Sequence, residues 1–216
     1  MTSSTALRIA IIGAGNVGSG LAHGWAAAGH TVTLGVRDPS SPDAVKGGAP
    51  HGVGISDVAT AVSDADIIVL ATPARVTADA LEPVRTTIAG RIVVDATNPL
   101  GAGLQLQTGP EGESHAEQLQ AQFPDARIVK CFNQTGAGNM PYSGGPARPV
   151  MFVAGNDASA CATVARLAEA LGFEAVQAGA LLRARELERL AMLWIALSAS
   201  SVAALGRNFV FTLQRG

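Results

Sequence analysis

The stretch Arg8-Ile-Ala-Ile-Ile-Gly-Ala-Gly-Asn-Val-Gly18 decides the fold of this chain. Its apolar run over residues 9–12 predicts a β-strand, which leads directly into a turn with three glycines and then into a helical pattern. In this context Gly13 forms the turn, Gly15 lets a pyrophosphate approach the backbone, and Gly18 lets the helix pack on the strand. The helix N-terminus offers free N–H groups and the positive end of its dipole to phosphate groups. The stretch therefore predicts a dinucleotide-binding turn, and the alternative is a glycine-rich turn without a ligand.

The composition is typical of a globular protein with a large core. Of the 216 residues, 48% are hydrophobic and 15% are charged, and the formal net charge is −2. This charge gives no electrostatic reason to expect a nucleic acid or an anionic membrane as a partner. No uncharged apolar run reaches the roughly 18 residues of a membrane span, and residues 1–7 lack the order of a signal peptide. We therefore expect a cytoplasmic protein in which Cys131 and Cys161 are buried, reduced thiols.

Strand and helix patterns alternate along the whole chain. The predicted strands cover residues 8–12, 30–36, 66–71, 91–95, 127–132, 149–154 and 174–177. The predicted helices cover residues 16–28, 57–63, 74–89, 114–122 and 158–171, followed by a helical tail from 181 to 205 or beyond. Such alternation predicts an α/β fold of the Rossmann type, with a doubly wound, mainly parallel sheet. We expect a dinucleotide-binding domain over 1–180 and a short helical C-terminal extension over 181–216, which packs on the domain or in a homodimer interface.

A few residues mark where the predicted helices begin and bend. Residues 38–54 are rich in Pro, Ser and Gly and predict a loop, after which Ser56 is expected to cap a short helix. Pro83 is expected to kink or split the helix over 74–89. Ser114 begins a capping box and is expected to start the next helix.

The end of the second strand bears on the choice between NAD and NADP. In NAD-specific folds an acidic residue at this point binds the ribose 2′-hydroxyl, whereas an arginine accommodates a 2′-phosphate. Here the strand ends at Val36, and Arg37 follows with a planar fork of donors, while Ser40 and Ser41 add hydroxyls. We therefore predict NADPH. Two alternatives stay open: Asp38 points inward and restores NAD use, or Arg37 is a solvated loop residue.

Two further segments follow strands of the predicted sheet at their carboxyl ends. Ala71, Thr72 and Pro73 lie at the end of the third predicted strand, and Asn98 and Pro99 lie just past the fourth. Ligands of doubly wound sheets bind beyond these strand ends. We expect both segments to wall the nicotinamide side of the cleft, although each proline is also explained by a simple turn.

The chain offers few groups for acid–base chemistry. The candidates are Lys46, Lys130, His23, His30, His51, His115 and Tyr142. None of the histidines has a partner placed for a proton relay, His115 is expected at the surface, and Tyr142 is expected to be structural. This scarcity favours an acceptor that needs only a hydride, such as a flavin or deazaflavin ring, which spreads the added charge over its own conjugated system. We predict no catalytic side chain and no metal ligand.

At this point several segments resemble a known family. The N-terminal glycine motif with Gly35-Val36-Arg37 resembles the NADPH-dependent coenzyme F420 reductases (F420:NADP oxidoreductases). The same holds for the later segments, which are also similar to the reductase domain of the six-transmembrane metalloreductases: Asp95-Ala-Thr-Asn-Pro-Leu100, Ser114-His-Ala-Glu-Gln-Leu119, Val129-Lys-Cys-Phe-Asn-Gln-Thr-Gly136 and Ala184-Arg-Glu-Leu-Glu188. The resemblance covers nearly the whole chain.

The resemblance implies where two cofactors bind. NADP(H) is expected across the strand ends, with coenzyme F420 or FMN/FAD stacked on the nicotinamide and no side-chain acid or base. The phosphate-loop residues implied by the family are Gly13, Gly15, Asn16 and Val17, with Gly18 from the motif itself. The implied 2′-phosphate residues are Val36 and Arg37, where the family often has Ser before Arg, so NADPH preference is expected to be weaker than usual. The implied deazaflavin-facing loop is Asn133, Gln134, Thr135, Gly136 and Ala137.

The leading hypothesis is therefore an oxidoreductase that transfers a hydride between NADP(H) and a deazaflavin or flavin, its small-molecule substrate. A small NADPH-dependent imine or carbonyl reductase is the second possibility, although that class normally has a larger helical domain. A non-catalytic regulator that binds NADP(H) is the third.

Overall fold

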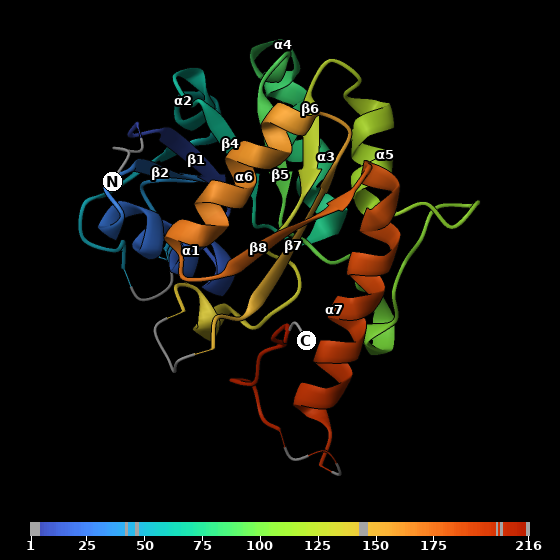
Figure 1. Ribbon diagram of the computed structural model, residues 1–216. Helices are drawn as coiled ribbons and strands as arrows, with labels where there is room; N and C mark the ends of the chain where they lie inside the picture. The colour runs from blue at the N-terminus through green and yellow to red at the C-terminus, as the bar shows by residue number, and fades with distance from the viewer. Residues whose placement is uncertain are drawn as a thin grey trace.

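One mainly parallel sheet forms the centre of the molecule (Figure 1). The computed structural model describes residues 5–41, 43–45, 48–142, 147–201, 203 and 205–214. Within them the strand order is β3-β2-β1-β4-β5-β6-β7-β8, and β7 alone runs antiparallel to the neighbour that precedes it in this order. The strands are β1 Arg8–Ile12, β2 Thr31–Val36, β3 Val53–Asp57, β4 Ile67–Leu70, β5 Ile92–Asp95, β6 Arg127–Lys130, β7 Val150–Gly155 and β8 Glu174–Gly179. The predicted doubly wound α/β class is confirmed.

Helices cover both faces of this sheet. The helices are α1 Asn16–Ala27, α2 Val58–Ser63, α3 Thr77–Leu81, α4 Arg85–Ile88, α5 His115–Gln122, α6 Ala158–Ala170 and α7 Ala184–Ala199. α1 and α6 lie on one face, and α2 to α5 lie on the other (Figure 1). Alternate residues of β1 separate accordingly, because successive strand side chains point to opposite faces. Ile11 packs in the core with Trp25 of α1, whereas Ile12 packs in the core with Leu81 of α3.

The structure corrects the prediction of a loop over residues 38–54, because β3 begins within it. Residues 53–57 pair in parallel with β2 and form the edge of the sheet. This edge strand lacks the continuous apolar run by which the buried strands are recognised in the sequence. Its Ile55 side chain remains 39% exposed. The cap of α2 also moves by one residue: Asp57 Oδ1 accepts from Thr60 N at 2.9 Å, whereas Ser56 Oγ donates to the Asp57 carbonyl.

The predicted helix over 74–89 is divided into four short pieces. A 3-10 turn, η1 (Ala74–Val76), precedes α3, and a second, η2 (Glu82–Val84), separates α3 from α4. The break contains Pro83, which has no N–H to donate to the preceding turn. Downstream, the capping box at Ser114 is confirmed, with its Oγ accepting from Glu117 N and the Glu117 carboxylate accepting from Ser114 N.

The helix of the C-terminal segment contacts α5 and β7, and it ends earlier than predicted. After a 3-10 turn, η5 (Leu181–Arg183), α7 ends at Ala199, and the described residues beyond it turn back toward β7. Val150 N donates to Phe211 O at 2.9 Å. The rings of Trp194 and Phe209 stack with centroids 5.2 Å apart. In the part of the chain that the structure describes, no helix is long and apolar enough to cross a bilayer.

Candidate functional site

The glycine turn between β1 and α1 is built as the motif requires. Gly13 has φ +110°, and a Cβ there would lie 2.8 Å from the backbone of Ala71. A Cβ on Gly18 would lie 2.0 Å from the Gly13 carbonyl oxygen, so this position needs glycine for the helix to pack on the turn. Gly15 differs, because its Cβ would meet nothing within 4 Å. Protein packing therefore explains Gly13 and Gly18, while Gly15 leaves open space in front of the N-terminus of α1.

Beside this turn lies a cavity of about 490 Å³, which we call the Arg37 cavity. It brings together four of the predicted residues, Gly13, Val36, Arg37 and Thr72. Thr72 Oγ1 is buried and has no hydrogen-bond partner among the described residues. A buried hydroxyl without a partner is uncommon in proteins, which marks this wall as a place for a ligand atom.

Asp38 and Ser40 bind each other next to this cavity and do not line it. Asp38 Oδ1 accepts from Ser40 N at 3.0 Å and from Ser40 Oγ at 2.6 Å. The pKa of Asp38 is held below its ordinary value mainly by the hydrogen bond from the Ser40 side chain and, after it, by the one from the Ser40 backbone. The Ser40 hydroxyl proton is thus already donated within the loop, and the Asp38 carboxylate is part of a local turn.

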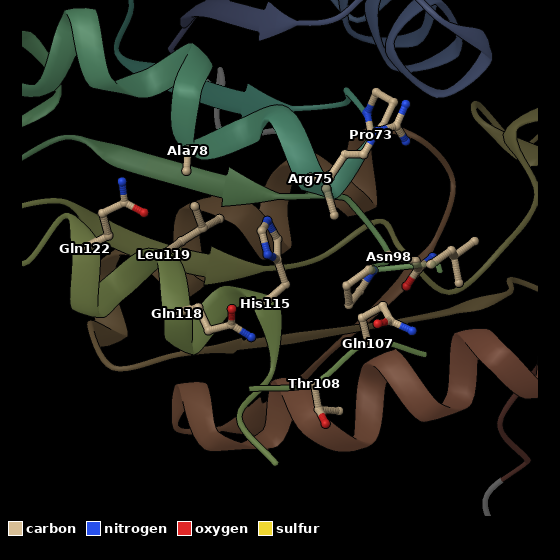
Figure 2. Close-up of a pocket in the computed structure, with 13 residues that line it drawn as sticks. Pro73, Arg75, Ala78, Asn98, Gln107, Thr108, His115, Gln118, Leu119 and Gln122 are labelled. Carbon is tan, nitrogen blue, oxygen red and sulfur yellow. The ribbon is translucent and has the colours of Figure 1, made fainter. Parts of the chain in front are cut away.

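A second cavity, of about 530 Å³, lies between α3, α5 and the loop after β5; we call it the His115 cavity (Figure 2). It contains the predicted residues Pro73, Asn98 and Pro99. In Figure 2 the imidazole of His115 points from α5 toward the segment that carries Ala78. Seven of its thirteen lining residues are polar or charged, which gives a ligand there many possible hydrogen-bond partners: Arg75, Asn98, Gln107, Thr108, His115, Gln118 and Gln122.

A third cavity, of about 760 Å³, is lined in part by the loop after β5; we call it the Trp194 cavity. It contains Asn16, Gly136 and Ala137 among the predicted residues, together with Leu100, Leu104, Trp194 and Arg207. A Cβ on Gly136 would lie 2.7 Å from Cη2 of Trp194, so the indole is packed against this glycine. Leu100 lines both this cavity and the His115 cavity, so the two are neighbours at this residue.

The remaining predicted residues lie around these cavities without lining them: Gly15, Val17, Gly18, Ser40, Ala71, Asn133, Gln134 and Thr135. The loop residues among them hold the walls together. Asn133 Nδ2 donates to Asn98 Oδ1 at 3.0 Å and to Leu187 O of α7 at 3.1 Å. Gln134 exchanges two hydrogen bonds with the backbone of Phe152, and Thr135 Oγ1 accepts from Asn139. In this structure their polar atoms bind protein.

Three buried ionised groups lie next to residues that line the His115 cavity; the sequence analysis named Lys130 as a candidate but did not connect it with the other two. Asp95 and Lys130 are the last residues of β5 and β6 and are register partners, and Glu188 reaches them from α7. Lys130 Nζ lies 2.8 Å from Asp95 Oδ2 and 2.9 Å from Glu188 Oε1, and all three side chains are at most 1% exposed. We call these residues the charge cluster. A lysine within the apolar run Ile128 to Phe132 was the available signal in the sequence.

His115 is half-buried, which corrects the expectation of a surface residue. Its Nε2 lies 2.8 Å from Thr77 Oγ1. Thr77 Oγ1 itself donates to Ala74 O, so we assign the Nε2 proton to the histidine, which donates to the hydroxyl. Burial lowers the pKa of His115, and the ring is therefore neutral near pH 7. Lys46 lies outside the described residues.

The other candidate groups are placed elsewhere. His23 and His51 are exposed, and His30 Nδ1 accepts from Leu7 N near the amino end of the sheet. Tyr142 packs against the core. Cys131 and Cys161 are buried free thiols, as predicted, and burial raises the pKa of both.

Comparison with known proteins gives a consistent result. The family described as NADP oxidoreductase, coenzyme F420-dependent, matches residues 8–99. The chain is similar to the F420-dependent NADP reductase of Methanothermobacter thermautotrophicus, with 28% identity over 89% of both chains. It is also 30% identical to the human metalloreductase STEAP2 over 84% of this chain but 35% of that protein, so it spans about a third of that relative.

A solved structure extends this similarity to the fold. The crystal structure of a candidate F420-dependent NADP reductase from Arthrobacter sp. FB24 has a TM-score of 0.86 and 33% identity. The match covers 97% of this chain and 100% of that chain. Similarity therefore extends over nearly all of this chain, beyond the glycine motif.

Proposed function

Since this chain belongs to the family of coenzyme F420-dependent NADP oxidoreductases, we propose that it transfers a hydride between NADP(H) and a deazaflavin or flavin. The observation that carries the proposal is that the three cavities are lined by segments that follow the carboxyl ends of neighbouring strands: the Gly13 turn lines the Arg37 cavity, Asn16 lines the Trp194 cavity, and Pro73 and Asn98 line the His115 cavity. A dinucleotide in a doubly wound sheet crosses the strand ends at such a turn. Its two halves would occupy the Arg37 and His115 cavities, and the redox acceptor would enter the Trp194 cavity.

The residues present fit NADP(H). Gly15 leaves open space in front of the N-terminus of α1, where a pyrophosphate would accept backbone hydrogen bonds. Thr72 Oγ1 supplies a buried hydroxyl that has no hydrogen-bond partner within the described ranges of the chain. Arg37 is exposed in its cavity and would hold the 2′-phosphate. The Asp38 carboxylate is bound to Ser40 outside the cavity, which supports NADP over NAD.

The Trp194 cavity has walls suited to a flat ring. Gly136 and Trp194 pack on each other on one side, and Leu100 and Leu104 lie in the loop that closes another. Nicotinamide and deazaflavin or flavin supply the redox chemistry when bound. The chain itself would align the rings and exclude water, with no side chain acting as acid or base.

Anaerobic mixing of NADPH with F420, and separately with FMN and FAD, tests the proposal. Reduction of one of these rings, seen as loss of its long-wavelength absorbance with loss of NADPH, is the expected result. No absorbance change with any of the three would refute the proposal. Turnover of imines or carbonyls instead would favour the small reductase, and tight NADP(H) binding without any turnover would favour the regulator.

Self-association also stays a prediction. Leu193 of α7 is 51% exposed beside the Trp194 cavity, and a homodimer would cover it. Sedimentation at micromolar concentration would show a monomer if this expectation is wrong.

A further inference from the structure

The charge cluster carries an unbalanced charge. Asp95 Oδ1 accepts from the Thr97 N–H and hydroxyl, and its Oδ2 accepts from Lys130. Both oxygens of Glu188 face the His115 N–H, and Oε1 also accepts from Lys130. The three protons of Lys130 Nζ go to Asp95, Glu188 and the Thr97 carbonyl. Every partner of the two carboxylates is a donor, so two anions and one cation give a net charge of −1.

The surroundings act on the three groups in different ways. Burial raises the pKa of Glu188, and the Lys130 ammonium offsets this in part. Burial alone would also raise the pKa of Asp95, but Lys130 and hydrogen bonds bring it below its ordinary value. For Lys130, burial acts to lower the pKa, and the carboxylates of Asp95 and Glu188 raise it. The ammonium and each carboxylate thus favour one another's charged forms, while the two carboxylates repel each other.

Stability alone does not account for this arrangement. Even a balanced buried ion pair gains little over apolar packing, because both charges lose water. A second buried carboxylate adds a desolvation cost and repels the first. Such a group is retained more readily where its field acts on something else, and the neighbouring cavity offers a target.

The cluster lies directly behind the lining of the His115 cavity. Asp95 accepts from the N–H and hydroxyl of Thr97, Lys130 donates to its carbonyl, and the next residue, Asn98, lines the cavity. Glu188 accepts from the backbone of His115, whose ring also lines it. The cluster, with its net negative charge, is therefore bonded to Thr97, next to the lining residue Asn98, and to the backbone of the lining residue His115, in a cavity whose lining also includes the exposed cation Arg75.

We propose that the charge cluster favours binding of the oxidised, cationic nicotinamide over the reduced, neutral one, and so makes bound NADPH a stronger hydride donor. The inference rests on the proposed function. Hydride donation breaks a C4–H bond of NADPH and moves two electrons with that hydrogen to the acceptor ring. The nicotinamide is left with one positive charge, and the reduced acceptor takes its balancing proton from water. A fixed negative charge lowers the free energy of the side of this reaction on which the nicotinamide is positive.

The ratio of the dissociation constants of NADPH and NADP⁺ measures this effect without turnover. Phosphate and adenosine contacts are common to both forms and cancel in the ratio. Glu188→Gln and Asp95→Asn each remove one negative charge, from different elements, with almost no change of volume. Each is expected to reduce the preference for NADP⁺ roughly tenfold, the order expected for one unit charge partly screened inside a protein.

Two matched variants control the measurement. Glu186→Gln makes the same charge change on α7, but Glu186 is exposed and forms its ion pair with Arg183 at the surface. Solvent screens such a charge, so the ratio should stay that of the wild type. Arg37→Ala should weaken both forms equally and also leave the ratio unchanged.

The wild type provides a second measurement in case the variants fail to fold. Protonation of Glu188 makes the same charge change, so the preference for NADP⁺ should decrease as the pH is lowered from about 8 to about 5. The ionisable groups that face Glu188 are Lys130, Asp95 and His115. Protonation of His115 adds positive charge and acts in the same direction.

The outcomes separate the inference from the function. If Glu188→Gln and Asp95→Asn fold and the ratio of the NADPH and NADP⁺ dissociation constants is the same as in the wild type, the inference is overturned. If these variants do not fold, a wild-type ratio that stays constant from about pH 8 to about pH 5 overturns it. Failure of the wild type to bind either NADPH or NADP⁺ overturns the proposed function instead.

Discussion

Replacing Lys130 by methionine should cause one of the largest losses of stability available in this protein. Methionine fills similar space but leaves Asp95 and Glu188 buried without their shared cation. Removing one partner of a buried ion pair costs about 3–5 kcal/mol. The three lost hydrogen bonds, at about 1.5–3 kcal/mol each for charged groups, would give a larger sum. Protonation of one of the carboxylates left without a cation relieves part of this loss. We therefore expect the free energy of unfolding to fall by the range given for a broken pair, about 3–5 kcal/mol. For a chain of this size this corresponds to a decrease in Tm of roughly 6–20 °C.

Urea unfolding of wild type and Lys130→Met at pH 7 measures this difference. Arg8→Met is the matched control, because it removes the cation of the exposed Arg8–Asp66 pair, whose side chains are 57% and 36% exposed. That loss should stay below about 1 kcal/mol. The difference for Lys130→Met should also shrink toward pH 5, because the orphaned carboxyls have raised pKa values and take up protons in the folded state. A loss no larger than that of Arg8→Met would refute the assignment of a dry, ionised cluster.

Further outcomes concern the turn, the 2′-phosphate and the imidazole. Gly18→Ala should strongly destabilise the fold, because the added Cβ would meet backbone atoms. Gly15→Ala adds a Cβ that meets nothing, so it should leave Tm within a few degrees of the wild type but weaken NADP(H) binding more than tenfold. Equal losses of Tm in the two variants would contradict this. Arg37→Ala should raise KM for NADPH roughly tenfold to a hundredfold and leave that for NADH unchanged, and an equal change for both, or none, would remove the phosphate assignment. Burial lowers the folded pKa of His115, so its contribution to stability is present above about pH 6.5 and is lost as pH falls through the lowered value. His115→Gln should therefore flatten the loss of stability below about pH 6.5, which the identical pH slope of wild type and variant would disprove.

The elements that the sequence predicts well are those set by local patterns. Ile9 to Ile12 and Ile67 to Leu70 are continuous apolar runs, and such runs become central strands because both faces of a parallel sheet are covered. The capping box at Ser114 is a contact between residues three apart, so spacing alone identifies it. Arg37 and Thr72 both follow the carboxyl ends of parallel strands, and these ends lie at one edge of the sheet. Their positions at one cavity are therefore also predictable from the sequence.

The strand β3 and the end of α7 depend on contacts that local patterns do not record. Residues 53–57 contain a glycine and two polar residues, and they become a strand because β2 offers an unpaired edge. The tail leaves the helix after Ala199 because Phe209 and Phe211 find partners in Trp194 and β7. Helical periodicity continues to favour a helix there until those distant partners are known.

The charge cluster joins residues 95, 130 and 188, so no spacing rule connects them. This cluster explains why the few ionisable groups in the sequence need not act as acids or bases. Lys130 donates all three of its protons to buried partners, and the Nε2 proton of His115 is donated to Thr77. The ionisable groups nearest the His115 cavity thus hold fixed charge and geometry rather than a transferable proton. That arrangement suits a reaction in which a hydride moves between two rings, because the chain then influences the transfer through alignment and through the field at the nicotinamide.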